Sequence, residues 1–189
     1  MSRALIAGCV LAAVLLAGSV AAPAGPGKEA RAMATPAFTL VSSAFAPGET
    51  VPKVHTCDGA DTSPPLVWHG VPAGTVSLAL LCDDPDAPAG TWVHWVVYDL
   101  APGTSELAAA VAKADTLAGG ARQGVNDFRK VGYGGPCPPR GHGAHRYFFR
   151  LLALDRKLGL PPRATLKQVL AAAEGHILGR AELMGRYGR

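Results

Sequence analysis

The sequence predicts a mainly β protein with one folded domain, and three observations support this fold class. Gly and Pro are frequent, at 23 and 16 of the 189 residues, without a collagen-like period, which is typical of a chain with many turns. Short apolar runs lie between these turns, whereas helix signals are sparse. Hydrophobic residues make up 49% and charged residues 17%, which excludes a disordered, strongly charged chain.

Five apolar runs are predicted to form strands. Runs 75–82 and 92–99 are bounded by Gly and Pro and contain β-branched or aromatic residues. The run 146–154 is almost continuously apolar, which is typical of a strand that is covered on both faces at the centre of a sheet. Shorter runs at 38–41 and 66–68 are expected at sheet margins.

Helix signals are clear at only one place. Thr165 is predicted to be the N-cap of a helix that Gly175 ends. A weaker pattern predicts a second helix over 105–113. The segment 114–143 is rich in Gly and Pro and is expected to be mostly loop, and long loops in compact domains often carry function. The pattern of 177–187 does not distinguish helix from strand.

The N-terminus has the form of a secretory signal. Arg3 precedes the apolar run 4–17, which is shorter than the roughly 20 residues of a permanent membrane span. Small residues follow, and we expect cleavage after Ala21, so that residues 1–21 are a signal peptide. Residues 22–36 are expected to be a flexible lead-in, and 37–189 the folded domain. The sequence therefore predicts a periplasmic or secreted protein.

Export changes the expected state of the cysteines, because thiols pair in an oxidising compartment. Cys57, Cys82 and Cys137 remain after cleavage, and three pairings are open, with three free buried thiols as the alternative. Cys82 ends an apolar run, which is typical of a buried small hydrophobic residue. Cys57 and Cys137 lie in Gly/Pro-rich loops, which favours a disulfide between these two.

Charge and motifs exclude several functions. The net charge of +4 is not gathered into a basic stripe with interleaved aromatic residues, so no nucleic-acid partner is expected. No Gly-x-Ser-x-Gly motif and no nucleophile frame is present, which disfavours an enzyme. We expect no cofactor and no metal, since the candidate zinc ligands lack a Cys-x-x-Cys pair. These candidates are His55, Cys57, Cys137, His142 and His145.

Polar residues lie near the ends of the predicted strands. Asp84 and Asp86 follow the first of them, His94 lies in the second, and His145 and Tyr147 open the third. Neighbouring strands can bring these groups together. Carboxylates close to imidazoles would keep the histidines charged or acting as donors, and with a tyrosine hydroxyl and Gly-rich loops they would form an anion cradle. Phosphate is the expected ligand.

Each of these signals also has a plain structural interpretation. The run Asp84-Pro85-Asp86 occurs in simple turns, in which Asp side chains bond their own backbone. His94 lies in an apolar run and fits a hydrogen-bonded core histidine. His142 is interpreted as a solvated loop residue, and Arg146 as a partner in a structural ion pair. The order and spacing of the signals together carry more weight than any one of them.

The order of these motifs resembles the phosphatidylethanolamine-binding protein family, in particular its bacterial Raf-kinase-inhibitor-like branch of the YbhB/YbcL type. The resemblance covers about residues 38–189. Its most specific parts are Asp84-Pro85-Asp86-Ala87-Pro88, Trp92-Val93-His94-Trp95 and Gly135-Pro136-Cys137-Pro138-Pro139, followed by His145-Arg146-Tyr147.

The resemblance implies a fold, a pocket and a pairing. The fold would be a large central antiparallel sheet packed on a smaller sheet, in the manner of a β-sandwich, with a few peripheral helices and a strand at 177–187. The pairing of Cys57 with Cys137 gains support. A small anion pocket for phosphate-bearing ligands would lie at one end of the sheet. Its implied residues are Asp84, Asp86, Pro88, His94, Pro139, His145 and Tyr147.

The sequence also departs from the animal members of this family. A single His94 follows Val93 where those members have two histidines, and no additional C-terminal helix is expected after the last strand. Binding to a eukaryotic kinase is therefore not carried over.

The function that we expect is that of an exported, non-catalytic binding protein for a small phosphate-bearing ligand or a phospholipid head group. Regulation of a partner protein, whose identity the sequence does not indicate, is compatible with this function. A protein inhibitor of a protease or kinase, acting through a surface loop, is the alternative. A hydrolase that depends on a His/Asp pair is less favoured. A homodimer is compatible with the sequence, although no residue requires one.

Overall fold

The computed structural model describes residues 36–189. The expected signal peptide 1–21 and all of the lead-in 22–36 except Pro36 lie outside the described residues. No helix within the described part of the chain is both long and apolar enough to cross a lipid bilayer.

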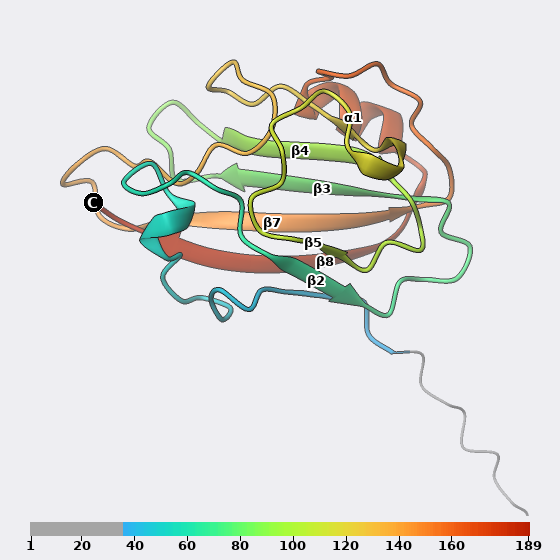
Figure 1. The fold of residues 1–189 in the computed structure, drawn as a ribbon, viewed down its shortest axis with the longest axis horizontal. Helices are drawn as coiled ribbons and strands as arrows, with labels where there is room; N and C mark the ends of the chain where they lie inside the picture. Colours follow the sequence, from blue (N-terminus) through green and yellow to red (C-terminus); the bar gives the residue numbers. More distant parts are fainter. Residues whose placement is uncertain (1–35) are drawn as a thin grey trace, which may run out of the picture. The chain divides into compact units, whose positions relative to one another are not determined.

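Two antiparallel sheets form the domain, as the resemblance implied (Figure 1). The large sheet has the strand order β6-β4-β3-β7-β8, and the small sheet has the order β1-β2-β5. The large sheet contains β3 (Ser77–Asp84), β4 (Trp92–Leu100), β6 (Arg122–Gln123), β7 (His145–Leu154) and β8 (Ile177–Tyr187). The small sheet contains β1 (Thr39–Val41), β2 (Leu66–His69) and β5 (Glu106–Leu107).

The core has two layers, one on each face of the large sheet. Between the sheets, Trp68 of β2 packs in one cluster with Trp95 and Phe149. On the opposite face, Leu81 packs with Val169 of helix α1 (Leu166–Ala173). All eight residues of β3 are buried, so β3 is the central strand. The sequence predicted this position for 146–154, but β7 lies beside the centre and is buried on both faces only in its second half.

One helix prediction is confirmed and one is wrong. Thr165 caps α1 through a capping box with Gln168. The pattern at 105–113 forms no helix, because its backbone groups bond elsewhere. Ser105 O accepts a hydrogen bond from Trp68 N at 2.9 Å, and Val111 N donates to Ser63 Oγ at 2.9 Å. Two 3-10 turns, η1 (Lys53–His55) and η2 (Ala118–Gly120), complete the helical elements of residues 36–189.

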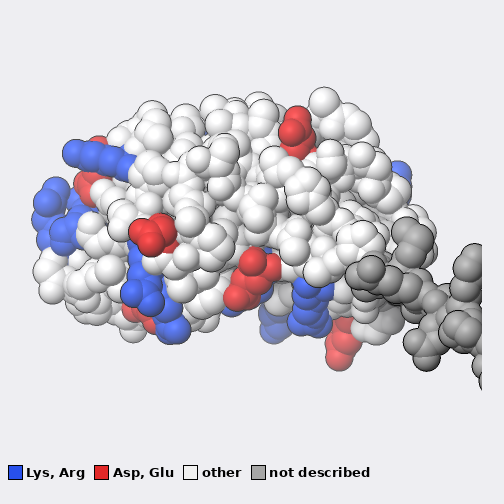
Figure 2. Space-filling view, turned by 90° about the horizontal axis from the view of Figure 1, so that it is seen from below, with Lys and Arg blue, Asp and Glu red and all other residues white. Residues whose placement is uncertain are grey.

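A disulfide joins Cys57 to Cys137, and Cys82 is free and buried, so the favoured pairing is confirmed. The bond ties the loop after η1 to the long segment that precedes β7. On the face shown in Figure 2, basic and acidic side chains are mixed, with basic groups at the end of the molecule where the C-terminus lies in Figure 1.

Candidate functional site

A pocket of about 320 Å³ lies where three distant stretches of the chain meet. The register of the large sheet explains the meeting. Asp84 ends β3 opposite Trp92 of β4, while Asp83 lies opposite Phe148 of β7, close to the start of that strand. Antiparallel pairing therefore brings the end of β3 next to the starts of both neighbours. The pocket is lined by Asp84, Ala87, Pro88, Ala89, Trp92, His94, Phe128, Cys137, Pro138, Pro139 and His145.

His94 has one ring nitrogen fixed and one left for the pocket. The residue is 2% exposed, and its Nδ1 lies 2.6 Å from the carbonyl oxygen of Gly134. A carbonyl only accepts, so Nδ1 carries the proton and Nε2 of the neutral ring has a free lone pair. Nε2 makes no hydrogen bond within the described residues. The rings of Phe128 and Tyr147 pack edge-on against the imidazole and hold its plane.

Burial lowers the pKa of His94, and this effect is larger than the opposing effects of the Gly134 hydrogen bond and the Asp84 charge. The sequence predicted that nearby carboxylates would keep the histidines charged. The alternative part of that prediction, that the histidines act as donors, agrees with the Nδ1 bond of His94 to Gly134, whereas burial disfavours the charged form of this ring.

Asp84 orients His145 instead. The two side chains are almost fully buried, and Nδ1 of His145 donates to Asp84 Oδ2 at 2.8 Å. The other carboxylate oxygen, Oδ1, accepts the backbone N–H of Asp86 at 2.8 Å. His145 Nε2 lies 3.3 Å from Nδ1 of His142, which is exposed. His145 therefore has a partner at each ring nitrogen, Asp84 at Nδ1 and His142 at Nε2. His142 is exposed, as expected of a solvated loop residue, but it also contacts a residue of the pocket lining.

The loop after β3 is anchored by Asp86, which does not line the pocket. The Asp86 carboxylate accepts hydrogen bonds from the backbone N–H and the guanidinium of Arg146, at 2.7 to 2.9 Å. These bonds lower the pKa of Asp86 to about 2. The structural interpretations of the Asp-Pro-Asp turn and of Arg146 are thus correct, and they act in support of the pocket, because the same loop carries Pro88.

Tyr147 also lies outside the lining. It is fully buried on the same face of β7 as His145, two residues further into the sheet, and its ring packs edge-on against that of His94 at 5.1 Å between centroids. Its hydroxyl has no hydrogen-bond partner within residues 36–189. Burial raises the pKa of this hydroxyl, and the nearby Asp84 adds to the effect. The Tyr147 ring thus helps to fix the plane of the His94 ring by packing against it.

The apolar wall is the part of the site that the sequence did not indicate. Phe128 comes from the long loop 114–143 and packs edge-on against Trp92 at 5.5 Å between ring centroids. Pro138 and the disulfide sulfur of Cys137 continue the wall. The long loop was expected to carry function, but an apolar side chain in it has no signature that distinguishes a pocket wall from core packing.

Five of the seven predicted ligand residues line the pocket, and Asp86 and Tyr147 support it from outside. The lining contains a single carboxylate and no Lys or Arg. Three arginines lie beside it: Arg140 follows Pro139, Arg146 follows His145, and Arg189 donates to the Cys137 sulfur at 2.9 Å. Arg146 and Arg189 are paired with Asp86 and Asp58. No cluster of three or more metal-ligating side chains occurs among the described residues.

The fold and the site define a class of protein: a two-sheet β protein with a histidine-containing pocket at the strand ends of its large sheet. Residues 41–188 match the family model described as phosphatidylethanolamine-binding protein. The chain therefore belongs to the phosphatidylethanolamine-binding protein family.

Relatives and solved structures agree with this assignment. UPF0098 proteins of Aquifex aeolicus and Methanothermobacter thermautotrophicus are 54% and 51% identical, over 79% and 80% of this chain and 88% and 99% of theirs. The crystal structure of Escherichia coli YbcL, described as a new member of the mammalian PEBP family, is 34% identical with a TM-score of 0.76. The match covers 80% of this chain and 98% of YbcL. A PEBP homologue of Chlamydia trachomatis, CT736, is 42% identical with a TM-score of 0.73, over 81% and 98%.

Proposed function

We propose that the protein is a non-catalytic binding protein whose pocket takes a small ligand with a phosphate group, such as a phosphoethanolamine head group. The observation that carries this proposal is the arrangement of two buried histidines at the pocket. Gly134 fixes His94 so that Nε2 is left for a ligand, and Asp84 orients His145 beside it. Family membership adds support, since the family model is named for binding phosphatidylethanolamine.

The binding chemistry follows from the tautomer of His94. A neutral ring with its proton on Nδ1 presents a lone pair at Nε2, which repels an ionised oxygen. An anion next to Nε2 favours protonation of the ring and reverses the effect of burial on its pKa. Binding therefore takes up a proton at His94. The exposed Arg140 adds positive potential near the entrance, and the apolar wall fits the carbon part of the ligand.

The lining supports a binding role rather than catalysis. It contains no Ser or Thr, and its one cysteine, Cys137, is held in the disulfide. The two buried histidines therefore have no side-chain hydroxyl of Ser or Thr and no free thiol beside them in the lining to activate. Incubating the purified protein with phosphate and acyl esters tests this part, and turnover that is lost in a His145→Ala variant would contradict it.

Export is part of the same proposal. The N-terminal pattern of 1–21 and the Cys57–Cys137 disulfide both fit an oxidising compartment. Expression of the full chain in a Gram-negative host, followed by fractionation and mass measurement, tests it. A product that begins at Ala22 in the periplasm or medium supports export, whereas an uncleaved chain in the cytosol contradicts it.

Ligand binding is tested by titrating phosphoethanolamine and inorganic phosphate into the domain and following the imidazole signals by NMR. The signals of His94 and His145 should shift together and saturate. His176 is the internal control, because it forms a 2.8 Å pair with Asp155 outside the pocket lining. His94→Asn is the test variant, since an Asn amide can keep the bond to Gly134 while it removes Nε2. Unmoved His94 and His145 signals at millimolar ligand would overturn the proposal.

A further inference from the structure

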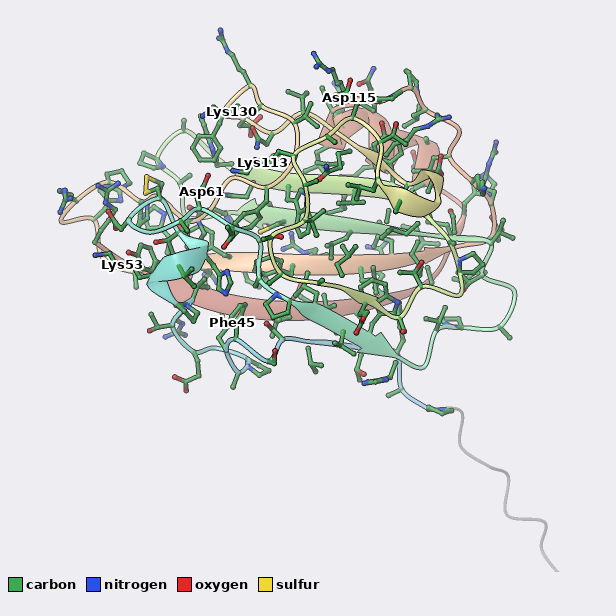
Figure 3. All side chains as sticks on the ribbon, in the orientation of Figure 1. Phe45, Lys53, Asp61, Lys113, Asp115 and Lys130 are labelled. Carbon is green, nitrogen blue, oxygen red and sulfur yellow. A yellow bond between two sulfur atoms is a disulfide. The ribbon has the colours of Figure 1, made fainter. Side chains whose placement is uncertain are left out.

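A second hollow, of about 560 Å³, is lined mainly by charged residues that the phosphate pocket does not use. Four cations and one carboxylate line it. Asp115 pairs with Arg163 at 3.0 Å, whereas Arg129 and Lys130 make no ion pair with another described residue. We call this feature the basic hollow. It is lined by Lys113, Ala114, Asp115, Val125, Arg129, Lys130, Val131 and Arg163. Figure 3 shows Lys113, Lys130 and Asp115 on the same side of the molecule, above β4.

Two of the four cations are held in an unfavourable backbone conformation. Arg129 has φ of 60° and Arg163 has φ of 70°, a region that favours Gly and Asn. The Arg129 turn is fixed by the buried Asn126, whose backbone oxygen accepts from Arg129 N at 2.9 Å and whose Oδ1 accepts from Lys130 N at 3.0 Å. Arginine therefore occupies two positions where Gly or Asn would be less strained.

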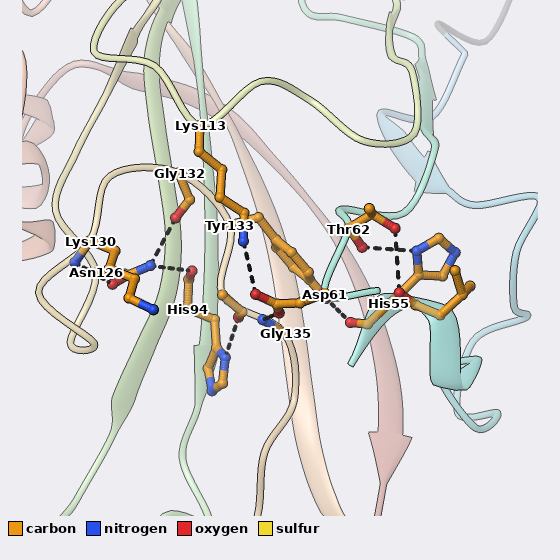
Figure 4. A network of polar contacts seen from close by, with 12 residues as sticks. His55, Asp61, Thr62, His94, Lys113, Asn126, Lys130, Gly132, Tyr133 and Gly135 are labelled. Carbon is orange, nitrogen blue, oxygen red and sulfur yellow. Dashed lines mark hydrogen bonds and ion pairs between the residues drawn. The ribbon is translucent and has the colours of Figure 1, made fainter. Parts of the chain in front are cut away.

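The basic hollow is connected to His94 by hydrogen bonds (Figure 4). Lys113 Nζ pairs with Asp61 Oδ2 at 2.8 Å, and Asp61 Oδ1 accepts the backbone N–H of Gly135 at 2.6 Å. The adjacent Gly134 donates its N–H to the backbone oxygen of His94 and accepts from the His94 ring. Lys113 and the segment that fixes the His94 ring therefore bind the same carboxylate, that of Asp61.

A second connection runs through Asn126. Its Oδ1 holds Lys130 N, while its Nδ2 donates to Gly132 O at 2.9 Å and contacts His94 O at 3.5 Å. Hydrogen bonds thus connect both lysines of the hollow to the backbone near His94, through Asp61 for Lys113 and through Asn126 for Lys130. The link through Asp61 begins at an exposed ion pair, whereas the hydrogen bonds from Asn126 Nδ2 are buried.

We propose that the basic hollow is a second anion-binding site, for a small ligand with two or more negative charges, and that its occupation is coupled to the His94 pocket. Asp61 and Asp115 each pair with one of the four cations, and the two charges left unpaired among the described residues, on Arg129 and Lys130, favour a polyanion over a single charge. No aromatic residue lines the hollow, so it lacks the stacking surface that single-stranded nucleic acid uses. The proposal goes beyond the phosphate-binding function and does not require it.

Inorganic tripolyphosphate is the probe, titrated into the domain by calorimetry at low salt. The test variant is Arg129→Asn with Lys130→Gln, which removes two exposed charges, and Asn suits the positive φ at 129. Affinity should fall by about tenfold or more. Arg163→Asn is a second variant with the same expected direction. Lys157→Gln is the matched control, since it removes one exposed charge outside the hollow and should leave affinity unchanged.

The His94→Asn variant separates this site from the phosphate pocket. Tripolyphosphate should still bind to it, because the hollow does not include His94. In the wild-type protein, saturation with tripolyphosphate should shift the His94 imidazole signal, and this shift should vanish in Asp61→Asn. Absent binding, equal affinity in the charge-removal variants, or binding that His94→Asn abolishes would overturn the site. An unmoved His94 signal at saturation would overturn the coupling.

Discussion

At the scale of single residues, the same His–Asp pair occurs twice in different surroundings. The side chains of His145 and Asp84 are 3% and 4% exposed, whereas those of His176 and Asp155 are 34% and 44% exposed. In both pairs the His Nδ1 lies 2.8 Å from a carboxylate oxygen. Removing one partner of a buried pair leaves the other without compensation, while an exposed pair regains water. The two pairs therefore form a matched experiment within one chain.

We predict that Asp84→Asn lowers the free energy of unfolding by about 2–4 kcal/mol. Asp155→Asn should lower it by less than about 1 kcal/mol. Urea unfolding of the two variants under the same conditions measures the difference. Equal losses would show that Asp84 does not hold His145 in a buried pair.

The pH dependence of stability is predicted to carry a contribution from His94. Burial lowers the pKa of this ring in the folded state, so the unfolded chain binds a proton first. The free energy of unfolding should therefore fall as the pH drops below about 6.5, down to the lower folded pKa. His94→Asn should show a smaller decrease between about pH 7.5 and 5.5. Parallel pH curves for the two proteins would contradict the assignment.

At the scale of elements, the loop after β3 depends on one ion pair across to β7. Arg146 holds Asp86 by three hydrogen bonds. Because the folded pKa of Asp86 is lowered to about 2, its contribution to stability is present above the ordinary carboxyl pKa. It is lost as the pH falls through that value toward 2. Partial exposure of both groups keeps this contribution small.

We predict that Arg146→Gln raises the pKa of Asp86 toward the ordinary value of about 3.9, since two of the three hydrogen bonds and the charge are removed. Ligand affinity should fall as well, because the loop that carries Pro88 loses its anchor. An NMR titration of the Asp86 carboxyl measures the first effect. Arg180→Gln on β8 is the control, and a pKa that stays near 2 in Arg146→Gln would refute the argument.

At the scale of the whole molecule, the disulfide closes a loop with a sequence separation of 80 and also forms part of the pocket wall. Reduction is predicted to lower the free energy of unfolding by about 4 kcal/mol. It should weaken ligand binding too, because Cys137 is joined to the prolines of the wall. Thiol labelling provides the control, since reduction should expose two reactive thiols while the buried Cys82 reacts only on unfolding. Unchanged ligand affinity after reduction would show that the disulfide does not contribute to binding in the pocket.

The sequence predicted the fold where local patterns carry the information. Apolar runs between Gly and Pro located the main strands, and a cap residue located α1. The central place of β3 could not be predicted, because it depends on pairing between distant strands. The pattern at 105–113 failed for the same reason, since distant groups such as Trp68 N take its backbone hydrogen bonds.

The polar part of the site could be predicted better than the rest. Asp84, His94 and His145 were recognisable because they lie near the ends of predicted strands, in an order and spacing that resemble those of the phosphatidylethanolamine-binding protein family. Phe128 was missed, since an apolar wall and an apolar core have the same composition. The low pKa of His94 was also missed, because it follows from burial, which the local pattern does not report.

Proton uptake on anion binding is the most direct test of the account. Sulfate is a suitable probe, since it does not titrate near neutral pH. Calorimetry at pH 7 in two buffers of different ionisation enthalpy gives the number of protons taken up for each sulfate bound. The measurement is made on the Arg129→Asn, Lys130→Gln variant, in which the basic hollow has lost two charges. We predict net uptake in this variant and none when His94→Asn is added to it. Sulfate binding without proton uptake, or uptake that persists after His94→Asn is added, would contradict the claim that His94 receives the anion.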